Sequence, residues 1–319
     1  VHAVLTGEDI GDHVMGNRVK DVPLLAKGVA RYIGEKVAAV VADDEPTAER
    51  ARDLVEVVYE ELDPVFTIDE ATAEGAPILH PNMMGYSGYI KPPPEPSNTF
   101  FTNVYGIGDI DVGFAEADLV FEDTYTTQRQ HPAFFEPRAC VVNAIPDGRV
   151  EIWTSTKAPY GLKGAIALAT GEEKERLVIN PTYVGGDFGG KGCPWDEPLC
   201  FFLSQETGRP VKMVMDYQEE FEAGNPRHPA IIKLRTGVKK DGTITAHHQD
   251  VVFNSGAYAG LMPQGYLAGT DRIAANFRIA HARFDHRHVY TNNVPGGYMR
   301  GPGEVQGSFA IESHMDEIA

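Results

Sequence analysis

The sequence predicts an α+β protein in which helices lie on mixed sheets. Two kinds of local signal support this fold class. The dipeptides Asp147-Gly148 and Asp241-Gly242 each separate two apolar runs and have the composition of tight hairpin turns. In addition, two helical stretches each stop just before a glycine, the residue that most often closes a helix in the left-handed conformation. These stretches are 158–169, before Gly171, and 195–206, before Gly208.

The N-terminal stretch has the pattern of a small α/β domain. Residues 1–5 are strand-like, and the apolar run at 36–42 predicts another strand. Asp44 is placed to cap a helix that has Pro46 in its first turn, where the missing proline N–H loses no hydrogen bond. Residues 55–60, Val-Glu-Val-Val-Tyr-Glu, again favour a strand.

A proline-rich segment separates this stretch from the rest of the chain. Residues 92–98, Pro-Pro-Pro-Glu-Pro-Ser-Asn, predict an extended, polyproline-like backbone with few core-forming side chains. We therefore expect an α/β domain at 1–75, an extended linker at 76–115 and a mixed-sheet domain at 116–319. Within the last domain, the apolar runs predict strands at 139–145, 150–154, 176–183, 210–216, 231–238 and 244–254.

Composition and charge argue against several classes of protein. The chain has 319 residues, of which 28 are lysine or arginine and 46 are aspartate or glutamate, so its formal net charge is −18. Nucleic acids and anionic membranes would repel such a chain. Cys140, Cys193 and Cys200 lack Cys-x-x-Cys spacing, which argues against an iron–sulfur cluster or a disulfide framework and favours a reducing cytoplasm. No apolar run approaches the roughly 20 residues of a membrane span.

A glycine-rich run at 184–192, Val-Gly-Gly-Asp-Phe-Gly-Gly-Lys-Gly, is the strongest candidate for a ligand site. It has the spacing of a Walker A loop, but Gly192 stands where that loop needs a serine or threonine to bind magnesium. Asp187 likewise breaks the spacing of a Rossmann fingerprint. Glycines on both sides of Phe188 let the backbone approach a large ligand while the ring forms an apolar wall. A tight turn that packs a phenylalanine is the alternative.

Two further segments combine rigid turns with polar side chains. Residues 298–304, Tyr-Met-Arg-Gly-Pro-Gly-Glu, place Arg300 among glycines and a proline, whose turns can hold its guanidinium against a fixed anion. An ordinary surface salt bridge is the alternative. This segment leads into 312–317, Glu-Ser-His-Met-Asp-Glu. The other segment, 130–137, is Gln-His-Pro-Ala-Phe-Phe-Glu-Pro.

In order and spacing, these three motifs resemble loops of the molybdenum hydroxylases, the xanthine dehydrogenase and aldehyde oxidoreductase family. The glycine run is similar to the family's Gly-Gly-Gly-Phe-Gly-Gly-Lys loop beside the metal, and the Arg300 segment resembles its Arg-Gly cofactor loop. The resemblance covers the whole chain and implies the N-terminal part of a molybdopterin-binding subunit. A small α/β hammerhead domain, incomplete at its N-terminus, would precede the first, mixed-sheet molybdopterin-binding domain.

The resemblance also implies particular site residues. No residue of this chain would bind molybdenum directly, and none would be catalytic, because the glutamate that acts as the family's base is expected beyond Ala319. Contacts to the cofactor would come from Gly186, Phe188, Gly189, Met299, Arg300 and Gly301.

Three positions depart from the family pattern. Lys157 takes the place of a glutamine near the metal. Its ammonium would either face the site, where it would bind an anionic substrate or donate to a metal-bound oxygen, or turn away as an ordinary residue at the start of a helix. Pro302 stands where purine oxidisers carry an aromatic residue that stacks on the substrate. Gly192 stands where they carry a purine-binding glutamate. Purine substrates are therefore disfavoured, and Lys157 and Pro302 are the candidate substrate contacts.

The implied function is part of the catalytic molybdenum subunit of a hydroxylase, which oxidises an aldehyde or an N-heterocyclic C–H carbon with oxygen from water. Its cofactor would be a molybdenum–pterin, in a simple or a cytosine dinucleotide form, with [2Fe-2S] clusters and FAD in partner chains. The rest of the molybdenum subunit would supply the base, so the chain alone is expected to be inactive, whether it is a fragment or a split subunit. A scaffold subunit without cofactor and a nucleotide-binding enzyme are the alternatives.

Histidines offer a metal hypothesis that the pattern disfavours. His247 and His248 are adjacent, so in a strand they point to opposite faces. His281, His286 and His288 cluster in the sequence, but no cysteine or carboxylate stands at zinc spacing. We expect these to be solvated strand histidines. A Ser-His-Asp hydrolase is disfavoured as well, because the sequence has no Gly-x-Ser-x-Gly motif.

Overall fold

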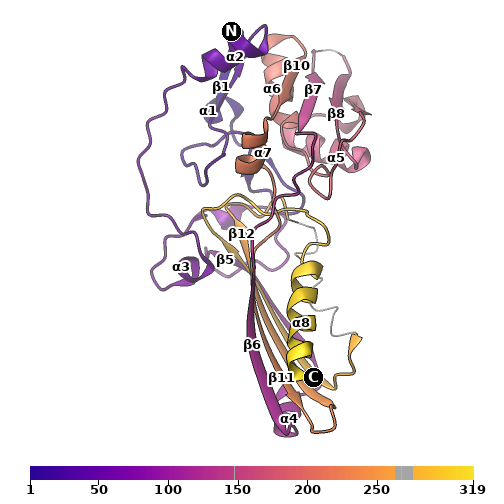
Figure 1. The fold of residues 1–319 in the computed structure, drawn as a ribbon. Coiled ribbons are helices and arrows are strands. Elements are labelled where there is room, and N and C mark those ends of the chain that lie inside the picture. The colour runs from indigo at the N-terminus through magenta and orange to yellow at the C-terminus, as the bar shows by residue number, and fades with distance from the viewer. Residues whose placement is uncertain (147, 263–266, 268–275) are drawn as a thin grey trace.

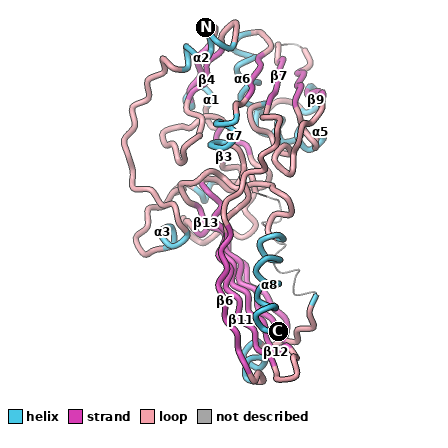
Figure 2. Tube along the Cα trace, viewed as in Figure 1, coloured by secondary structure: helices cyan, strands magenta, loops and turns pink. Residues whose placement is uncertain are grey.

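Strands form two bodies in an elongated molecule (Figure 1). One body is a long five-stranded sheet beside which the chain ends, and the other is a group of smaller sheets that holds the N-terminus. The structure is a computed structural model and describes residues 1–146, 148–262, 267 and 276–319. Figure 2 shows in the same view that loops occupy most of the space between the two bodies.

A two-stranded antiparallel sheet begins the chain, as predicted. β1 (Ala3–Thr6) pairs with β4 (Ala38–Val41), and α2 (Glu45–Arg52) follows. The predicted cap is confirmed, because the Asp44 carboxylate accepts the Thr47 N–H at 2.8 Å and Pro46 lies in the first turn. Short elements complete this region: α1 (Gly7–Ile10), β2 (Val14–Met15), β3 (Val22–Pro23) and the 3₁₀ helix η1 (Met83–Gly85).

The strand predicted at 55–60 is wrong. These residues belong to a loop that runs along one side of the molecule from α2 to α3 (Ile68–Thr72) (Figure 1). Val58 and Tyr59 are exposed there. A β-branched composition does not make a strand by itself, because the backbone also needs a hydrogen-bonded neighbour. In the described part of the chain, the sheet nearest in sequence contains only β1 and β4.

A four-stranded mixed sheet carries two longer helices. Its order is β10-β7-β8-β9, with β8 and β9 parallel and the other pairs antiparallel. Both glycine-closed helices are confirmed, with Gly171 at φ 73° and Gly208 at φ 62°. The hairpin strands also pair as predicted, although residue 147 of their turn lies outside the described residues. The elements are β7 (Ala139–Asn143), β8 (Val150–Thr154), α5 (Pro159–Thr170), η2 (Lys174–Arg176), β9 (Leu177–Pro181), α6 (Glu197–Thr207), β10 (Val211–Val214) and α7 (Tyr217–Ala223).

The five-stranded sheet has the order β5-β13-β12-β11-β6, in which only β12 and β13 are parallel. The hairpin predicted at Asp241-Gly242 is confirmed, and Gly242 has φ 85°. α8 lies along one face of the sheet, over β11 and β6 (Figure 1). None of the helices in the described residues is long and apolar enough to cross a membrane. The elements are β6 (Leu119–Thr127), β11 (Ala230–Val238), β12 (Ile244–Gly256), β13 (His281–Tyr290) and α8 (Glu304–Ile318).

Part of the segment expected to be a linker belongs to this sheet. Residues 92–98 contain no helix or strand, but β5 (Thr99–Ile107) pairs with β13, and α4 (Ile110–Ala115) packs at the far end of the sheet. The linker prediction is therefore wrong for residues 99–115. The proline run dominated the composition of the segment, whereas Phe100 and Phe101 at the start of β5 are buried.

The prediction of solvated strand histidines is wrong for His247, His286 and His288, which are buried, whereas His248 and His281 are partly exposed. His247 lies 2.9 Å from the Thr236 hydroxyl beneath α8, and His288 packs between the rings of Phe101 and Phe253. Burial disfavours the charged form of the His247 imidazole and lowers its pKa to about 4. His248 points to the other face, where its Nε2 lies 2.6 Å from Asp285.

Asp21 joins the N-terminal region to the segment that follows β12 and to β13. Its buried carboxylate accepts the N–H groups of Ala259 and Gly260, both at 2.7 Å, and the Tyr290 hydroxyl at 2.9 Å. Burial raises the pKa of Asp21 to about 6, although these hydrogen bonds oppose the shift.

We predict that Asp21→Ala lowers the free energy of unfolding by about 3 kcal/mol, because it leaves three buried donors without an acceptor. Urea denaturation monitored by circular dichroism measures the change. Asp12→Ala, which removes an exposed carboxylate, should change this free energy by less than about 0.5 kcal/mol. Equal effects of the two substitutions would contradict the structural role of Asp21.

Candidate cofactor site

The glycine-rich run 184–192 forms a loop after β9 with a left-handed backbone. The φ angles are 106° at Gly186, 47° at Phe188 and 116° at Gly189. A Cβ atom on Gly186 would lie 2.8 Å from Cβ of Phe134, and one on Gly189 would lie 2.7 Å from the carbonyl oxygen of Tyr298. Only glycine fits at these two positions, because the neighbouring segments approach so closely.

The segment that contains Arg300 packs directly on Phe188. The Arg300 N–H donates to the Phe188 carbonyl oxygen at 3.0 Å, and its guanidinium carbon lies 4.7 Å from the centre of the Phe188 ring. A cation over an aromatic face is attracted by the ring electrons. The tight turns predicted here are present, with positive φ angles of 38° at Arg300, 61° at Gly301 and 83° at Gly303. Two motifs far apart in the sequence thus lie side by side.

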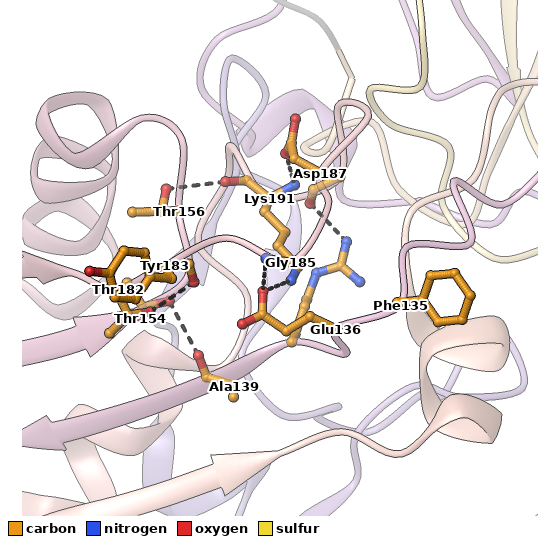
Figure 3. A network of polar contacts seen from close by, with 12 residues as sticks. Phe135, Glu136, Ala139, Thr154, Thr156, Thr182, Tyr183, Gly185, Asp187 and Lys191 are labelled. Atoms are coloured by element: carbon orange, nitrogen blue, oxygen red, sulfur yellow. Dashed lines mark hydrogen bonds and ion pairs between the residues drawn. The ribbon is translucent and has the colours of Figure 1, made fainter.

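The third motif, 130–137, anchors the same loop (Figure 3). The Glu136 carboxylate accepts the Gly185 N–H at 2.8 Å and the Lys191 ammonium at 2.5 Å. The buried Lys191 ammonium also lies 4.6 Å from the centre of the Phe134 ring. Burial would raise the pKa of Glu136, but the hydrogen bonds from Lys191 and Gly185 hold it below its ordinary value. Because Lys191 is held within the fold, these contacts argue against the nucleotide-binding hypothesis.

Arg138 holds the glycine loop through a hydrogen bond to its backbone. Sequence analysis did not identify this residue. Its buried guanidinium donates to the Gly190 carbonyl oxygen at 2.8 Å and also bonds Glu220 and Asn225. The guanidinium carbon lies 4.7 Å from the centre of the Trp195 ring. An arginine at the start of a strand has no pattern in the sequence that distinguishes it from a surface residue.

Asp187 ties the loop to Lys157. Its carboxylate accepts the Lys191 N–H at 2.6 Å, the Gly189 N–H at 2.8 Å and the Lys157 ammonium at 2.8 Å. Burial alone would raise the pKa of Asp187, but these partners lower it. Sequence analysis left two orientations open for Lys157, and in the structure its ammonium lies against the glycine loop.

A cleft of about 480 Å³ lies beside the loop, between residues 16–20, α5 and the glycine run. This volume is in the range of ligand sites. Among the site residues predicted from the sequence, Lys157 and Gly189 line the cleft. Phe188, Gly186, Arg300, Gly301 and Pro302 lie in the two loops next to it, and Met299 is buried behind them. Sequence analysis missed the glycines of α5 that leave room for the cleft, Gly161 and Gly164.

A second arginine adjoins Arg300. Arg227 donates to the carbonyl oxygen of Arg300 at 3.0 Å and to that of Met299 at 3.4 Å. Burial, and after it the charge of Arg300, lowers the pKa of Arg227. Two neighbouring guanidinium groups repel each other, so an anionic group beside them would be stabilised.

Outside the cleft, Asp123, His314 and Thr236 form a hydrogen-bonded chain like that of a catalytic triad. The His314 ring lies 2.5 Å from the Asp123 carboxylate through Nδ1 and 2.8 Å from the Thr236 hydroxyl through Nε2. Thr236 and His314 are completely buried between α8 and the sheet, so no substrate reaches the hydroxyl. These two hydrogen bonds hold α8 against β6 and β11. Among the described residues, no three His, Cys, Asp or Glu side chains gather as metal ligands.

The mixed sheets place the glycine loop (184–192) and the segment 298–304, here called the arginine loop, beside one cleft. This arrangement is typical of a domain that binds a large cofactor. Comparisons with known families agree with this class. Residues 92–319 match the molybdopterin cofactor-binding domain, and residues 1–63 match the aldehyde oxidase and xanthine dehydrogenase a/b hammerhead domain. The chain therefore belongs to the xanthine dehydrogenase and aldehyde oxidase family of molybdenum hydroxylases, as its motifs predicted.

Individual relatives extend over the whole chain. It is 33% identical over 324 residues to a probable xanthine dehydrogenase protein of Bacillus subtilis, covering 100% of this chain and 41% of the relative. It is 32% identical over 327 residues to the nicotinate dehydrogenase large molybdopterin subunit of Eubacterium barkeri, covering 100% of this chain and 72% of the relative. The chain thus spans less than half of the first relative.

Solved structures show the same fold. The CO dehydrogenase from Oligotropha carboxidovorans superposes with a TM-score of 0.90 at 26% identity, covering 99% of this chain and 41% of that chain. The aldehyde oxidoreductase from Desulfovibrio gigas superposes with a TM-score of 0.88 at 30% identity, covering 100% of this chain and 35% of that chain.

The residues at the site suit a molybdopterin, which is a polar pterin that carries a phosphate. The adjacent Arg227 and Arg300 provide positive charge for an anion, and the cleft has the volume for a fused-ring ligand. Backbone groups of the glycine loop border the cleft at Gly189 and Gly192, where side chains would narrow it.

We predict that Phe188→Ala destabilises the fold much less than Phe134→Ala. Phe188 is 45% exposed, so its truncation should cost about 1 kcal/mol of unfolding free energy. Phe134 is 2% exposed and packs against two cations, so its truncation should cost about 3 to 5 kcal/mol. Thermal denaturation of the two variants measures the loss of unfolding free energy. Equal losses in both variants would mean that Phe188 is a core residue.

Proposed function

We propose that this chain forms the first half of the molybdenum cofactor site of a hydroxylase. The enzyme would oxidise an aldehyde or an N-heterocyclic C–H carbon and take the new oxygen from water. The observation that carries this proposal is that the glycine run and the Arg300 segment meet beside one cleft, while the 130–137 segment holds the glycine run through the Glu136–Lys191 pair. Membership of the molybdenum hydroxylase family supports it.

In this proposal the chain positions the cofactor, and the molybdenum centre supplies the redox chemistry when it is bound. Gly186 and Gly189 let the loop pack closely on Phe134 and Tyr298, which places Phe188 as an apolar wall beside the cofactor. Arg300, in its turn with Met299 and Gly301, would neutralise negative charge on the pterin side. The cofactor would be a molybdenum–pterin in a simple or a cytosine dinucleotide form, and [2Fe-2S] and FAD would lie in partner chains.

The proposed substrate contacts are Lys157 on the wall of the cleft and Pro302 in the arginine loop. Relatives with similar chains carry names that specify xanthine, nicotinate or aldehydes. Gly192 and Pro302 lack the groups that hold a purine in this family, so we favour an aldehyde or a smaller heterocycle for this chain.

In this proposal the catalytic base and the other half of the cofactor shell come from a further part of the molybdenum subunit, in line with the 41% of the Bacillus relative that this chain covers. A reducing cytoplasm is part of the proposal, since the three cysteines are free thiols and Sγ of Cys140 lies 3.7 Å from Sγ of Cys200 without a disulfide. A scaffold subunit of the same fold without cofactor is the competing function. Molybdenum content separates the two.

The chain alone should hydroxylate neither aldehydes nor heterocycles when it is supplied with molybdenum cofactor. The same chain assembled with the remainder of its molybdenum subunit and the electron-transfer partners should be active and contain molybdenum. Elemental analysis and dye-reduction assays measure both properties. Turnover by the isolated chain would contradict the division of the site, and a fully assembled protein without molybdenum would favour the scaffold function.

In the assembled protein, Phe188→Ala should reduce molybdenum content or turnover by about tenfold or more while the protein stays folded. Phe66→Ala is the matched control, because Phe66 has a similar exposure, 51% against 45%, and lies in the loop before α3. Elemental analysis and steady-state kinetics of both variants provide the comparison. A loss shared equally by the two variants would contradict a role for Phe188 at the cofactor.

A further inference from the structure

The cation that faces the cleft is already paired with an internal carboxylate. The Lys157 ammonium lies 2.8 Å from the Asp187 carboxylate. The side chain of Lys157 is 47% exposed and lines the cleft, whereas that of Asp187 is 16% exposed. The ammonium is therefore presented to a ligand with its charge balanced by a fixed neighbour.

Asp187 is the fixed half of this pair. One of its oxygens accepts the Lys191 N–H at 2.6 Å, and the oxygen that binds Lys157 also accepts the Gly189 N–H at 2.8 Å. Turning the carboxylate away would leave these two backbone donors without their acceptor. The backbone of Lys157 is tied to the same loop, because its N–H donates to the Lys191 carbonyl oxygen at 3.3 Å.

Gly192 makes room for the pair. A Cβ atom at this position would lie 3.2 Å from Cε of Lys157, so any larger residue would press on the lysine stem. Lys157, Asp187 and Gly192 thus form one unit on the wall of the cleft. The other cation that lines the cleft, Lys20, donates to the carbonyl oxygens of Gly16 and Asn17, and burial lowers its pKa.

From this geometry we infer that Asp187 is a specificity-determining residue that makes the cleft select neutral ligands over carboxylates. The inference rests on the proposed function only in taking the part of the cleft beside Lys157 as the place of the substrate. A carboxylate in the cleft would have to share Lys157 with Asp187 and would meet the Asp187 charge at short range. A neutral aldehyde or heterocycle would meet a balanced pair, whose ammonium can still donate a hydrogen bond.

Calorimetric titration with benzoate and benzamide, two probes of similar shape and different charge, tests the inference on the full assembled protein. Asp187→Asn should tighten benzoate binding about tenfold, equivalent to about 1.4 kcal/mol, and leave benzamide within about twofold. The gain should vanish in Asp187→Asn combined with Lys157→Gln. Asp12→Asn removes the same charge at an exposed residue that does not line the cleft and should leave the ratio of the two affinities unchanged.

An unchanged ratio in Asp187→Asn, or no benzoate binding by this variant, would overturn the inference. A gain that persists without Lys157 would overturn it as well. Asp187→Glu retains the charge and should keep the ratio of the unsubstituted protein, which separates the effect of charge from a disturbed loop. The titration needs no turnover. A protein with the expected ratio but no molybdenum would support the selectivity and contradict the proposed function.

Discussion

The ion pair between the buried Lys191 ammonium and the partly exposed Glu136 carboxylate is the contact on which the site depends. It holds the end of the glycine loop against the 130–137 segment, where the Phe134 ring covers the Lys191 ammonium, and removing Glu136 would leave the buried Lys191 charge unpaired. Asp187 holds the middle of the loop through backbone N–H groups. Phe188 is thereby kept in a left-handed conformation that a phenylalanine rarely adopts by itself, and Arg300 packs on its ring.

Sequence reasoning succeeded where the local chain decides the structure. The hairpin at Asp241-Gly242 and the end of α5 at Gly171 depend on residues that tolerate positive φ, and composition reveals those directly. It failed where a distant partner decides. Residues 55–60 have the composition of a strand but no neighbouring strand to pair with among the described residues. By contrast, β5 is a strand because its backbone forms hydrogen bonds with β13.

The same division applies to the site. Glycines and prolines identify both loops, because close approach and tight turns demand them, and the family resemblance followed from their order. Arg138 and the contact between Lys157 and Asp187 could not be predicted, because an ion pair between distant segments has no characteristic spacing. The contact with Asp187 changes the kind of ligand that Lys157 is expected to bind. An unpaired ammonium in the cleft would favour anions, whereas we infer that the paired one favours neutral ligands, in line with the substrates proposed from Gly192 and Pro302.

The central claim is that the glycine loop and the arginine loop together border a bound molybdenum cofactor. Anomalous X-ray scattering at the molybdenum absorption edge, from crystals of the assembled protein, tests this claim most directly because it locates the metal without reference to activity. We expect a single anomalous peak on this chain, in the cleft beside Gly189 and flanked by the Phe188 ring and Arg300. A molybdenum peak remote from residues 184–192 and 298–303 would contradict the assignment of the site.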